Sequence, residues 1–399
     1  MQSSIPPPNA TQRSTALAPQ SGYRVLYRFQ DNAQGGLDGA NPFARLFSTN
    51  DALYGTTYNG GAHGAGTVFS FTTGGAEKVL YAFRGGRDGA NPEAGLIAVT
   101  GLLYGTTPAG GATCYPNGCG TVFSVTTAGT EKVLYRFRGG SDGADPFAGL
   151  INVNGILYGT TVTGGRGCDP SGCGTIFSVT TTGAEKVLHV FNGADGESPQ
   201  AGLIDVNGVL YGATAGGGAH GRGTIFSVTT SGTQTVLHSF AGGSDGWGPL
   251  SSLIDIRGTL YGTTVDGGSA DCYNNYGCGT VFSATTRGTE KVLYRFRAGR
   301  DGANPIASLI DVNGMVYGTT ENGGSNSYCR EPNNGCGTVF SLTTSGSEKV
   351  LHSFAGNSDG ALPFASLIIV RDRLYGTTQQ GGGGSTGCDS CGTVFAISP

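Results

Sequence analysis

The chain is poor in several residue types that mark common classes of protein. It contains one Trp, two Met and five His, and charged residues make up only 13% of its 399 positions. No apolar run approaches the ~18 residues that a membrane-spanning helix needs. With 23 Lys and Arg against 27 Asp and Glu, the net charge is −4, whereas a nucleic-acid-binding protein needs a basic face. These shortages argue against membrane-spanning and nucleic-acid-binding functions.

Glycine is the residue that the chain has in excess, with 74 of 399 positions. The glycines do not follow a G-X-Y period, which excludes a collagen triple helix. An aromatic content of 9% and regular runs of Val, Leu and Ile argue against disorder. The excess therefore belongs to a folded chain with many turns.

One phrase, LYGTT or a close variant of it, occurs seven times. The copies begin at Leu53, Leu103, Leu157, Leu210, Leu260, Val316 and Leu374, with spacings of 50, 54, 53, 50, 56 and 58 residues. A period near 50 is typical of propeller blades rather than of helical solenoids.

The fourth repeat shows the structural unit clearly. Four runs rich in Val, Ile, Leu, Thr, Phe and Tyr occupy 202–206, 209–214, 223–230 and 234–240, and each is bounded by Gly or Asn. Such runs predict β-strands, which we name A to D from the inner to the outer edge of a blade. Asn207-Gly208 between A and B suits a tight hairpin turn.

These repeats predict an all-β fold, a seven-bladed β-propeller of four-stranded antiparallel blades. The outer strand of the seventh blade is missing at the C-terminal end, and its copy, Val25–Phe29, precedes the first repeat. We therefore expect the N-terminal strand to close the ring, which hides a sheet edge that would invite aggregation. The predicted domains are a flexible linker at 1–22 and a propeller at 23–399. No signal peptide is visible in the linker.

The phrases LYGTT, GTVFSxTT and EKVLYxF, with DGANPxAGL between blades, resemble the GloVer tandem repeats of bacterial extracellular proteins. The resemblance covers essentially the whole chain beyond residue 22. It implies a secreted or surface-anchored propeller, although no C-terminal anchor is recognisable in this sequence. The resemblance supplies no catalytic residue. The strand plan is also similar to quinoprotein-type propellers, but the tryptophans of those repeats are missing.

The ten cysteines form five close pairs, all between strands B and C. These loops hold 12 to 16 residues, whereas the two loops without cysteine, 58–65 and 215–222, hold eight. Cysteine thus accompanies loop length, which favours disulfides within loops and an oxidising compartment. A metal site would need pairs from different blades to meet, and the CxxC of the last pair is also a redox spacing. The predicted pairs are Cys114–Cys119, Cys168–Cys173, Cys272–Cys278, Cys329–Cys336 and Cys388–Cys391.

Several motifs resemble catalytic or cofactor-binding sequences. Three G-x-S-x-G matches, at Ser141, Ser244 and Ser358, lack the following helix of a nucleophile elbow. His189, His238 and His352 replace a repeated Tyr and are expected to be ordinary strand residues. An Asp-Gly recurs in every D–A connection, where turn chemistry is favoured over a calcium ring, which needs six to eight oxygens. We therefore predict no catalytic residue, no metal and no cofactor.

Function is expected where the repeats differ, on the face that carries the D–A and B–C loops. Non-repeated aromatic and basic residues above blades 5 and 6 predict a binding patch for an extracellular glycan, wall polymer or protein, although they could instead pack the long loops around their disulfides. A polysaccharide hydrolase or lyase, which needs a carboxylate pair such as Glu93 and Glu197, and a self-assembling surface subunit are the alternatives. The patch comprises Trp247, Tyr273, Tyr276, Tyr328 and Arg330.

Overall fold

The structure is a computed structural model of the chain. It describes residues 22–30, 37–49, 52–111, 114, 117–165, 167, 168, 171–269, 272, 276–325, 329, 335–383 and 391–399. The predicted linker at 1–22 lies almost entirely outside these residues.

Twenty-eight strands in the described residues form seven four-stranded antiparallel sheets, one for each blade. Blade 1 contains β2 (Phe47–Thr49), β3 (Ala52–Thr57), β4 (Thr67–Thr72) and β5 (Glu77–Ala82); blade 2 contains β6 (Ile97–Val99), β7 (Leu102–Thr107), β8 (Thr121–Val125) and β9 (Glu131–Arg136); blade 3 contains β10 (Ile151–Val153), β11 (Ile156–Thr161), β12 (Thr175–Thr180) and β13 (Glu185–Val190). Blade 4 contains β14 (Ile204–Val206), β15 (Val209–Thr214), β16 (Thr224–Thr229) and β17 (Gln234–Ser239); blade 5 contains β18 (Ile254–Ile256), β19 (Thr259–Thr264), β20 (Thr280–Thr285) and β21 (Glu290–Arg295); blade 6 contains β22 (Ile310–Val312), β23 (Met315–Thr320), β24 (Thr338–Thr343) and β25 (Glu348–Ser353). Blade 7 contains β26 (Ile368–Val370), β27 (Arg373–Thr378), β28 (Thr393–Ile397) and β1 (Arg24–Arg28).

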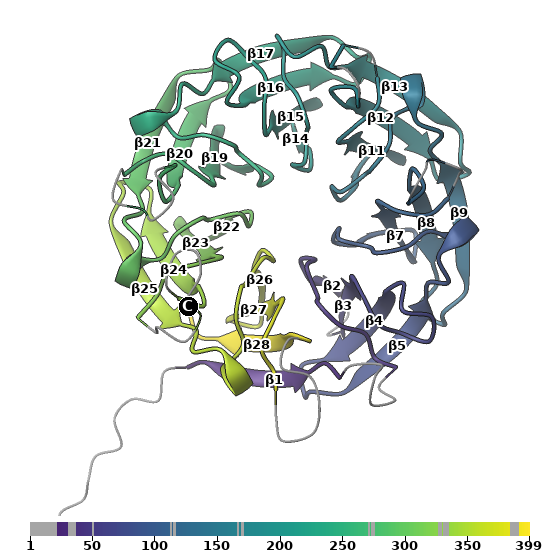
Figure 1. Cartoon of the computed structure of the whole chain (residues 1–399), viewed down its shortest axis with the longest axis horizontal. Coiled ribbons are helices and arrows are strands. Elements are labelled where there is room, and N and C mark those ends of the chain that lie inside the picture. The colour runs from purple at the N-terminus through teal and green to yellow at the C-terminus, as the bar shows by residue number, and fades with distance from the viewer. Residues whose placement is uncertain are drawn as a thin grey trace, which may run out of the picture.

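The blades stand around a central channel as the repeats predict (Figure 1). Blade 7 has the strand order β1-β28-β27-β26, so the N-terminal strand forms its outer edge. Antiparallel pairing aligns Arg24 with Ala396 and Arg28 with Thr393, and Figure 1 shows β1 lying beside β28 at the rim. The predicted seven-bladed fold and its closure are both confirmed.

The core lies between neighbouring blades, where the repeated phenylalanines meet edge to face. Phe137 at the end of strand D in blade 2 contacts Phe177 in strand C of blade 3, with ring centroids 5.0 Å apart. The equivalent pair occurs at all seven junctions, including the two junctions of the closing blade. Aromatic pairs at this spacing add to the energy of apolar burial. The same phenylalanine pair therefore joins neighbouring blades at all seven junctions.

The glycine of LYGTT leaves space for this phenylalanine. A Cβ atom on Gly159 would lie 2.7 Å from Cζ of Phe177 and 3.0 Å from Cδ2 of Leu150. The same close approach occurs at the equivalent glycine of the other six blades. Glycine within a strand often marks such a close approach, and this approach accounts for the repeated glycine.

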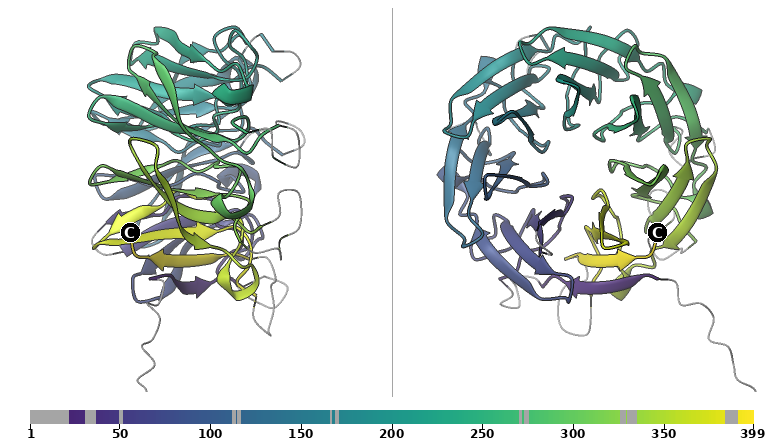
Figure 2. Two further views of the ribbon diagram at one scale, coloured as in Figure 1. Left: turned by 90° about the vertical axis from the view of Figure 1, so that its left-hand side faces the viewer. Right: turned by 180° about the vertical axis from the view of Figure 1, so that it is seen from behind.

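The two faces of the disc differ. The D–A and B–C connections share one face, because a backbone bridge joins them in each blade, as between Ala40 and Asn59 or Trp247 and Asp266. In the left view of Figure 2, where the disc is seen edge-on, these connections lie along its right-hand side. Short 3-10 turns lie in five D–A connections: η2 (Gly86–Asp88), η3 (Gly140–Asp142), η4 (Gly243–Asp245), η5 (Gly299–Asp301) and η6 (Asn357–Asp359). Within the described residues no helix is long and apolar enough to cross a membrane.

Candidate binding pocket above blades 4 and 5

A pocket of about 500 Å³ opens on the loop face where blade 4 meets blade 5. Its side chains come from three loops: the short B–C loop of blade 4, the D–A connection entering blade 5, and the B–C loop of blade 5. The lining residues are Arg222, Gly243, Ser244, Trp247, Gly267, Gly268, Ser269, Tyr276 and Gly277. The pocket thus combines aromatic, cationic and hydroxyl side chains with glycines, which present only their backbone.

Trp247 is held in the pocket by its backbone. Its N–H donates to the Asp266 carbonyl at 3.0 Å, and its carbonyl accepts from the Asp266 N–H at 3.1 Å. Alanine takes part in the equivalent bridge at five other junctions: Ala40, Ala90, Ala144, Ala303 and Ala361. The bridge therefore forms without an aromatic side chain, and the indole is not required to build the blade.

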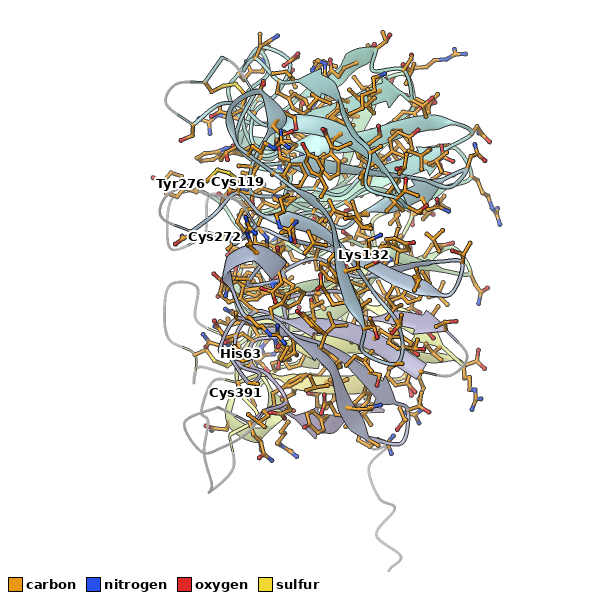
Figure 3. All side chains as sticks on the ribbon, turned by 90° about the vertical axis from the view of Figure 1, so that its right-hand side faces the viewer. His63, Cys119, Lys132, Cys272, Tyr276 and Cys391 are labelled. Atoms are coloured by element: carbon orange, nitrogen blue, oxygen red, sulfur yellow. A yellow bond between two sulfur atoms is a disulfide. The ribbon has the colours of Figure 1, made fainter. Side chains whose placement is uncertain are left out.

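Tyr276 provides the second aromatic wall. Its ring meets that of Trp247 edge to face, with centroids 5.5 Å apart. The residue is 58% exposed, the most exposed aromatic of the described residues. Figure 3 shows Tyr276 at the loop face of the disc. Two of the aromatic residues named in the predicted patch, Trp247 and Tyr276, therefore contact each other in the structure.

Arg222 completes the pocket and was missed by the sequence reasoning. Its guanidinium carbon lies 4.6 Å from the centroid of the Trp247 ring, a cation–π distance. Arg222 stands at the repeat position that holds the second cysteine in five other loops, and it packs against Gly242 as the Cys114 and Cys119 sulfurs pack against Gly139. An arginine in place of that cysteine was the signal that could have identified it.

The other predicted patch residues cannot be placed in this pocket. Tyr273, Tyr328 and Arg330 lie outside the described residues. Their role in binding remains a prediction.

Four of the five predicted disulfides are present: Cys114–Cys119, Cys168–Cys173, Cys272–Cys278 and Cys329–Cys336. Their Cα atoms lie 5.0 to 5.6 Å apart, within the range that a disulfide spans. The fifth pair involves Cys388, which lies outside the described residues. The bonds close loops within single blades, as the loop lengths predict.

The central channel forms a second cavity, of about 450 Å³. Its lining includes Glu93, Arg45 and Asp255. Burial raises the pKa of Glu93 to about 7, whereas the Asp255 carboxylate accepts the Gly258 N–H of its own hairpin turn at 2.9 Å. Glu197 instead forms a backbone bridge with Gly216 on the loop face. The carboxylates named in the hydrolase alternative, Glu93 and Glu197, therefore do not share one cavity wall.

The recurring Asp of each D–A connection takes the turn role that the sequence predicts. Asp88, for example, accepts the Arg84 N–H at 3.0 Å and the Tyr81 hydroxyl at 2.8 Å. In three blades histidine replaces that tyrosine, and the Nε2 atoms of His189, His238 and His352 contact their aspartates at 3.1, 3.4 and 3.1 Å. The three histidines are strand residues, as expected, and each also joins a polar cluster at the outer rim.

Comparison with known proteins identifies the repeat. The Gloeobacter/Verrucomicrobia repeat matches residues 15–169 and 166–395. No curated protein matches the chain significantly in sequence.

Solved structures resemble this chain only weakly. The phage phi92 endosialidase is 11% identical with a TM-score of 0.49, over 95% of this chain and 69% of that one. A gluconolactonase from Xanthomonas campestris is 11% identical with a TM-score of 0.43, over 94% of this chain and 88% of that one. At such identities the likeness carries no information about ligands or activity.

Proposed function

This chain belongs to the Gloeobacter/Verrucomicrobia repeat family, and on that premise we propose that it is an extracellular binding propeller whose pocket above blades 4 and 5 holds a carbohydrate. The observation that carries the proposal is the contact of Trp247 with both Tyr276 and Arg222. All three are departures from the repeated phrases. They stand together on the loop face, around one pocket.

The pocket's chemistry suits a sugar ring. Aromatic side chains offer large contact areas at low cost in conformational entropy, and the apolar face of a pyranose can stack on them. Arg222 supplies fixed N–H donors for hydroxyl oxygens, and Ser244 and Ser269 line the same pocket. A ligand with one apolar face and several hydroxyls fits this set better than a purely apolar one.

The disulfides support an extracellular location. Bonds of this kind persist in oxidising compartments and are rare in the cytosol. Four of them lie in the loops of the same face as the pocket. The binding face is therefore also the face that an oxidising environment would stiffen.

Trp247→Ala is the most informative variant, because other blades of the same chain have alanine at the equivalent position. Alanine occupies this position at five other junctions, so we expect the variant to keep the melting temperature of the wild type. Binding to a glycan array and to insoluble bacterial cell wall should fall at least tenfold, as for a lost hot-spot aromatic. Arg222→Ala should weaken binding less, because Trp247 and Tyr276 remain.

The matched control is Tyr58→Ala, which removes a loop aromatic in blade 1, far from the pocket. It should leave glycan binding unchanged. Wild-type affinity in Trp247→Ala with an unaltered melting temperature would contradict the pocket. A marked loss of stability in that variant would instead mean that the indole packs the loops. Release of reducing ends from any bound polysaccharide would favour the hydrolase alternative.

A further inference from the structure

The outer rim carries one polar cluster at each junction between blades, which we call a rim cluster. Each consists of the Asp of a D–A connection, the Tyr or His of the preceding strand D, and a residue near the start of strand D in the next blade. Four clusters contain Asp, Tyr and Glu: Asp38, Tyr27 and Glu77; Asp88, Tyr81 and Glu131; Asp142, Tyr135 and Glu185; Asp301, Tyr294 and Glu348.

The three clusters that contain histidine differ in their third member. His189 and Asp195 are joined by Gln234, whose amide donates to the Asp195 carbonyl at 3.3 Å. His352 and Asp359 are joined by Tyr23, which stacks on the imidazole with centroids 3.7 Å apart. Among the described residues, only the junction of blades 4 and 5 brings His, Asp and Glu together, as His238, Asp245 and Glu290.

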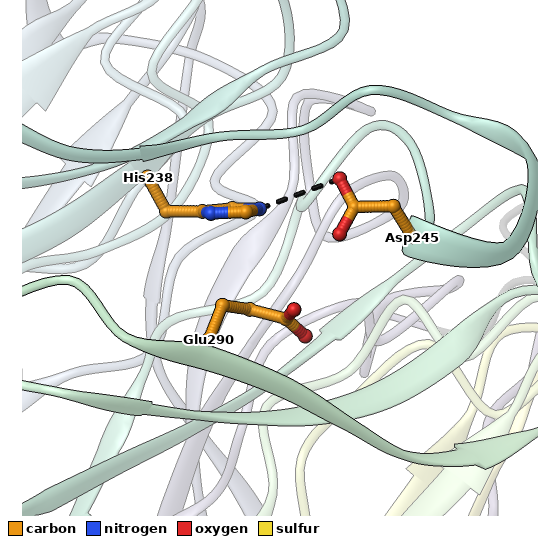
Figure 4. A group of neighbouring side chains, drawn as sticks. All are labelled: His238, Asp245 and Glu290. Atoms are coloured by element: carbon orange, nitrogen blue, oxygen red, sulfur yellow. Dashed lines mark hydrogen bonds and ion pairs between the residues drawn. The ribbon is translucent and has the colours of Figure 1, made fainter.

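The three side chains of this cluster lie close enough together to hold a divalent cation. One donor atom from each residue lies within 4.8 Å of the other two, and Nε2 of His238 is 3.4 Å from Oδ2 of Asp245. Two ligands bound to zinc at about 2.1 Å in tetrahedral geometry lie about 3.4 Å apart. Figure 4 shows the imidazole directed at the aspartate and the glutamate reaching toward both from the neighbouring strand.

Glu290 also has an unsatisfied oxygen. Its Oε1 is buried and has no hydrogen-bond partner within the described residues, and the same holds for the equivalent Oε1 atoms of Glu77, Glu131, Glu185 and Glu348. Glu290 differs from those four glutamates in having an imidazole beside it, that of His238. A bound cation would satisfy that oxygen and neutralise the two neighbouring carboxylates.

We propose that His238, Asp245 and Glu290 bind a zinc ion that ties blade 4 to blade 5 at the outer rim. Imidazole with carboxylates is a ligand set for zinc, whereas calcium and magnesium prefer oxygen ligands alone. The side chains of His238 and Asp245 remain 21 and 23% exposed, so the site is reached from solvent and leaves a position for water. The inference stands apart from the carbohydrate pocket and does not depend on it.

The chain contains its own controls for this site. His238→Tyr recreates the Asp, Tyr and Glu cluster of four other junctions, and Glu290→Gln recreates the His189, Asp195 and Gln234 cluster. Both variants should therefore fold. After treatment with EDTA and dialysis, the untagged wild type should bind one zinc per chain by calorimetry and metal analysis, with a rise in melting temperature. Each variant should bind at least tenfold more weakly and lose that rise.

A gain-of-site variant sharpens the test. Gln234→Glu places a carboxylate beside His189 and Asp195, whose Nε2 and Oδ2 atoms are 3.1 Å apart, and should raise the stoichiometry to two. Cobalt should give the visible absorption of a tetrahedral site in the wild type and not in His238→Tyr. Zinc binding that is unchanged in both loss variants, or no zinc binding by the wild type, would overturn the proposal. A failure of Gln234→Glu to gain zinc would contradict the role given to Glu290.

Discussion

The strand framework and the loop face of this propeller obey different constraints. In the framework, the same phenylalanine pair seals every junction at 5.0 to 5.3 Å. On the loop face, Arg222 in the fourth repeat takes the position of the second cysteine of five other loops, and Trp247 takes the position of a repeated alanine. The framework repeats because each blade must fit two neighbours, whereas the loops have solvent on one side.

The difference shows where a repeat protein can acquire a site. A departure within the framework must preserve packing, as at the rim clusters, where Tyr is exchanged for His and Glu for Gln without loss of the blade. A substitution on the loop face can introduce a larger side chain without changing the packing between strands. The junction of blades 4 and 5 carries departures of both kinds, which is why both proposals fall there.

Truncation of the closing strand should give the largest effect. Deleting residues 1–30 removes β1 and with it Phe29, which leaves β28 as an unpaired edge. We expect aggregation and loss of the cooperative melting transition. Deleting residues 1–20 removes no part of β1 and should leave the melting curve unchanged; equal curves for the two truncations would contradict closure.

Adding a methyl group inside one blade should give the second largest loss of stability. Gly159→Ala would place its Cβ 2.7 Å from Cζ of Phe177, and overpacking of this kind costs about 1–3 kcal/mol. Chemical denaturation should show that loss of unfolding free energy. Gly155→Ala is a partial control, because its Cβ has open space although its φ is +85°, so it separates backbone strain from overpacking.

Reduction of the disulfides should affect the loop face far more than the framework. Each bond closes a loop of five to seven residues in sequence separation, which is worth about 2 kcal/mol in the chain-entropy model. Because these loops can open without separating strands, we expect the far-ultraviolet circular dichroism to persist and the melting temperature to fall by only a few degrees. Hydrogen exchange should speed up in the loops; complete unfolding on reduction would show that the framework depends on them.

Neutralising a rim glutamate should give the smallest effect, and one that depends on pH. Burial, and then the charge of Asp88, raise the pKa of Glu131 from 4.5 to about 7. The native state therefore holds this proton more tightly than the unfolded state, so the glutamate increasingly destabilises the fold as the pH rises from 4.5 to 7. Glu131→Gln should stabilise the protein at pH 8 by about 1 kcal/mol, discounted for solvent screening of a half-buried group, and should have no effect at pH 4. A stabilisation independent of pH would refute this account.

The repeat period and the displaced N-terminal strand were enough to predict the blades, their number and the closure of the ring. Loop length was enough to pair the cysteines that the structure describes. Trp247 and Tyr276 could be singled out because they break the pattern, but their contact could not, since it depends on how two loops fold over the strands. Arg222 and the rim clusters were missed because their roles depend on contacts with distant residues: Arg222 lies against Trp247, 25 residues away, and His238 lies near Glu290, 52 residues away in the adjacent blade.

The closing strand also governs the order in which this molecule can fold. Tyr23 donates a hydrogen bond to the Asp359 carbonyl, 336 residues along the chain, and β1 pairs only with β28. At a synthesis rate of ~5–20 residues per second, β1 would wait about 20–70 s for its partner to leave the ribosome. During that time blades 1 to 6 can assemble as an open arc with an unpacked blade face at each end. Ring completion is then a late, long-range event, and a chaperone or an export pathway has that interval in which to act.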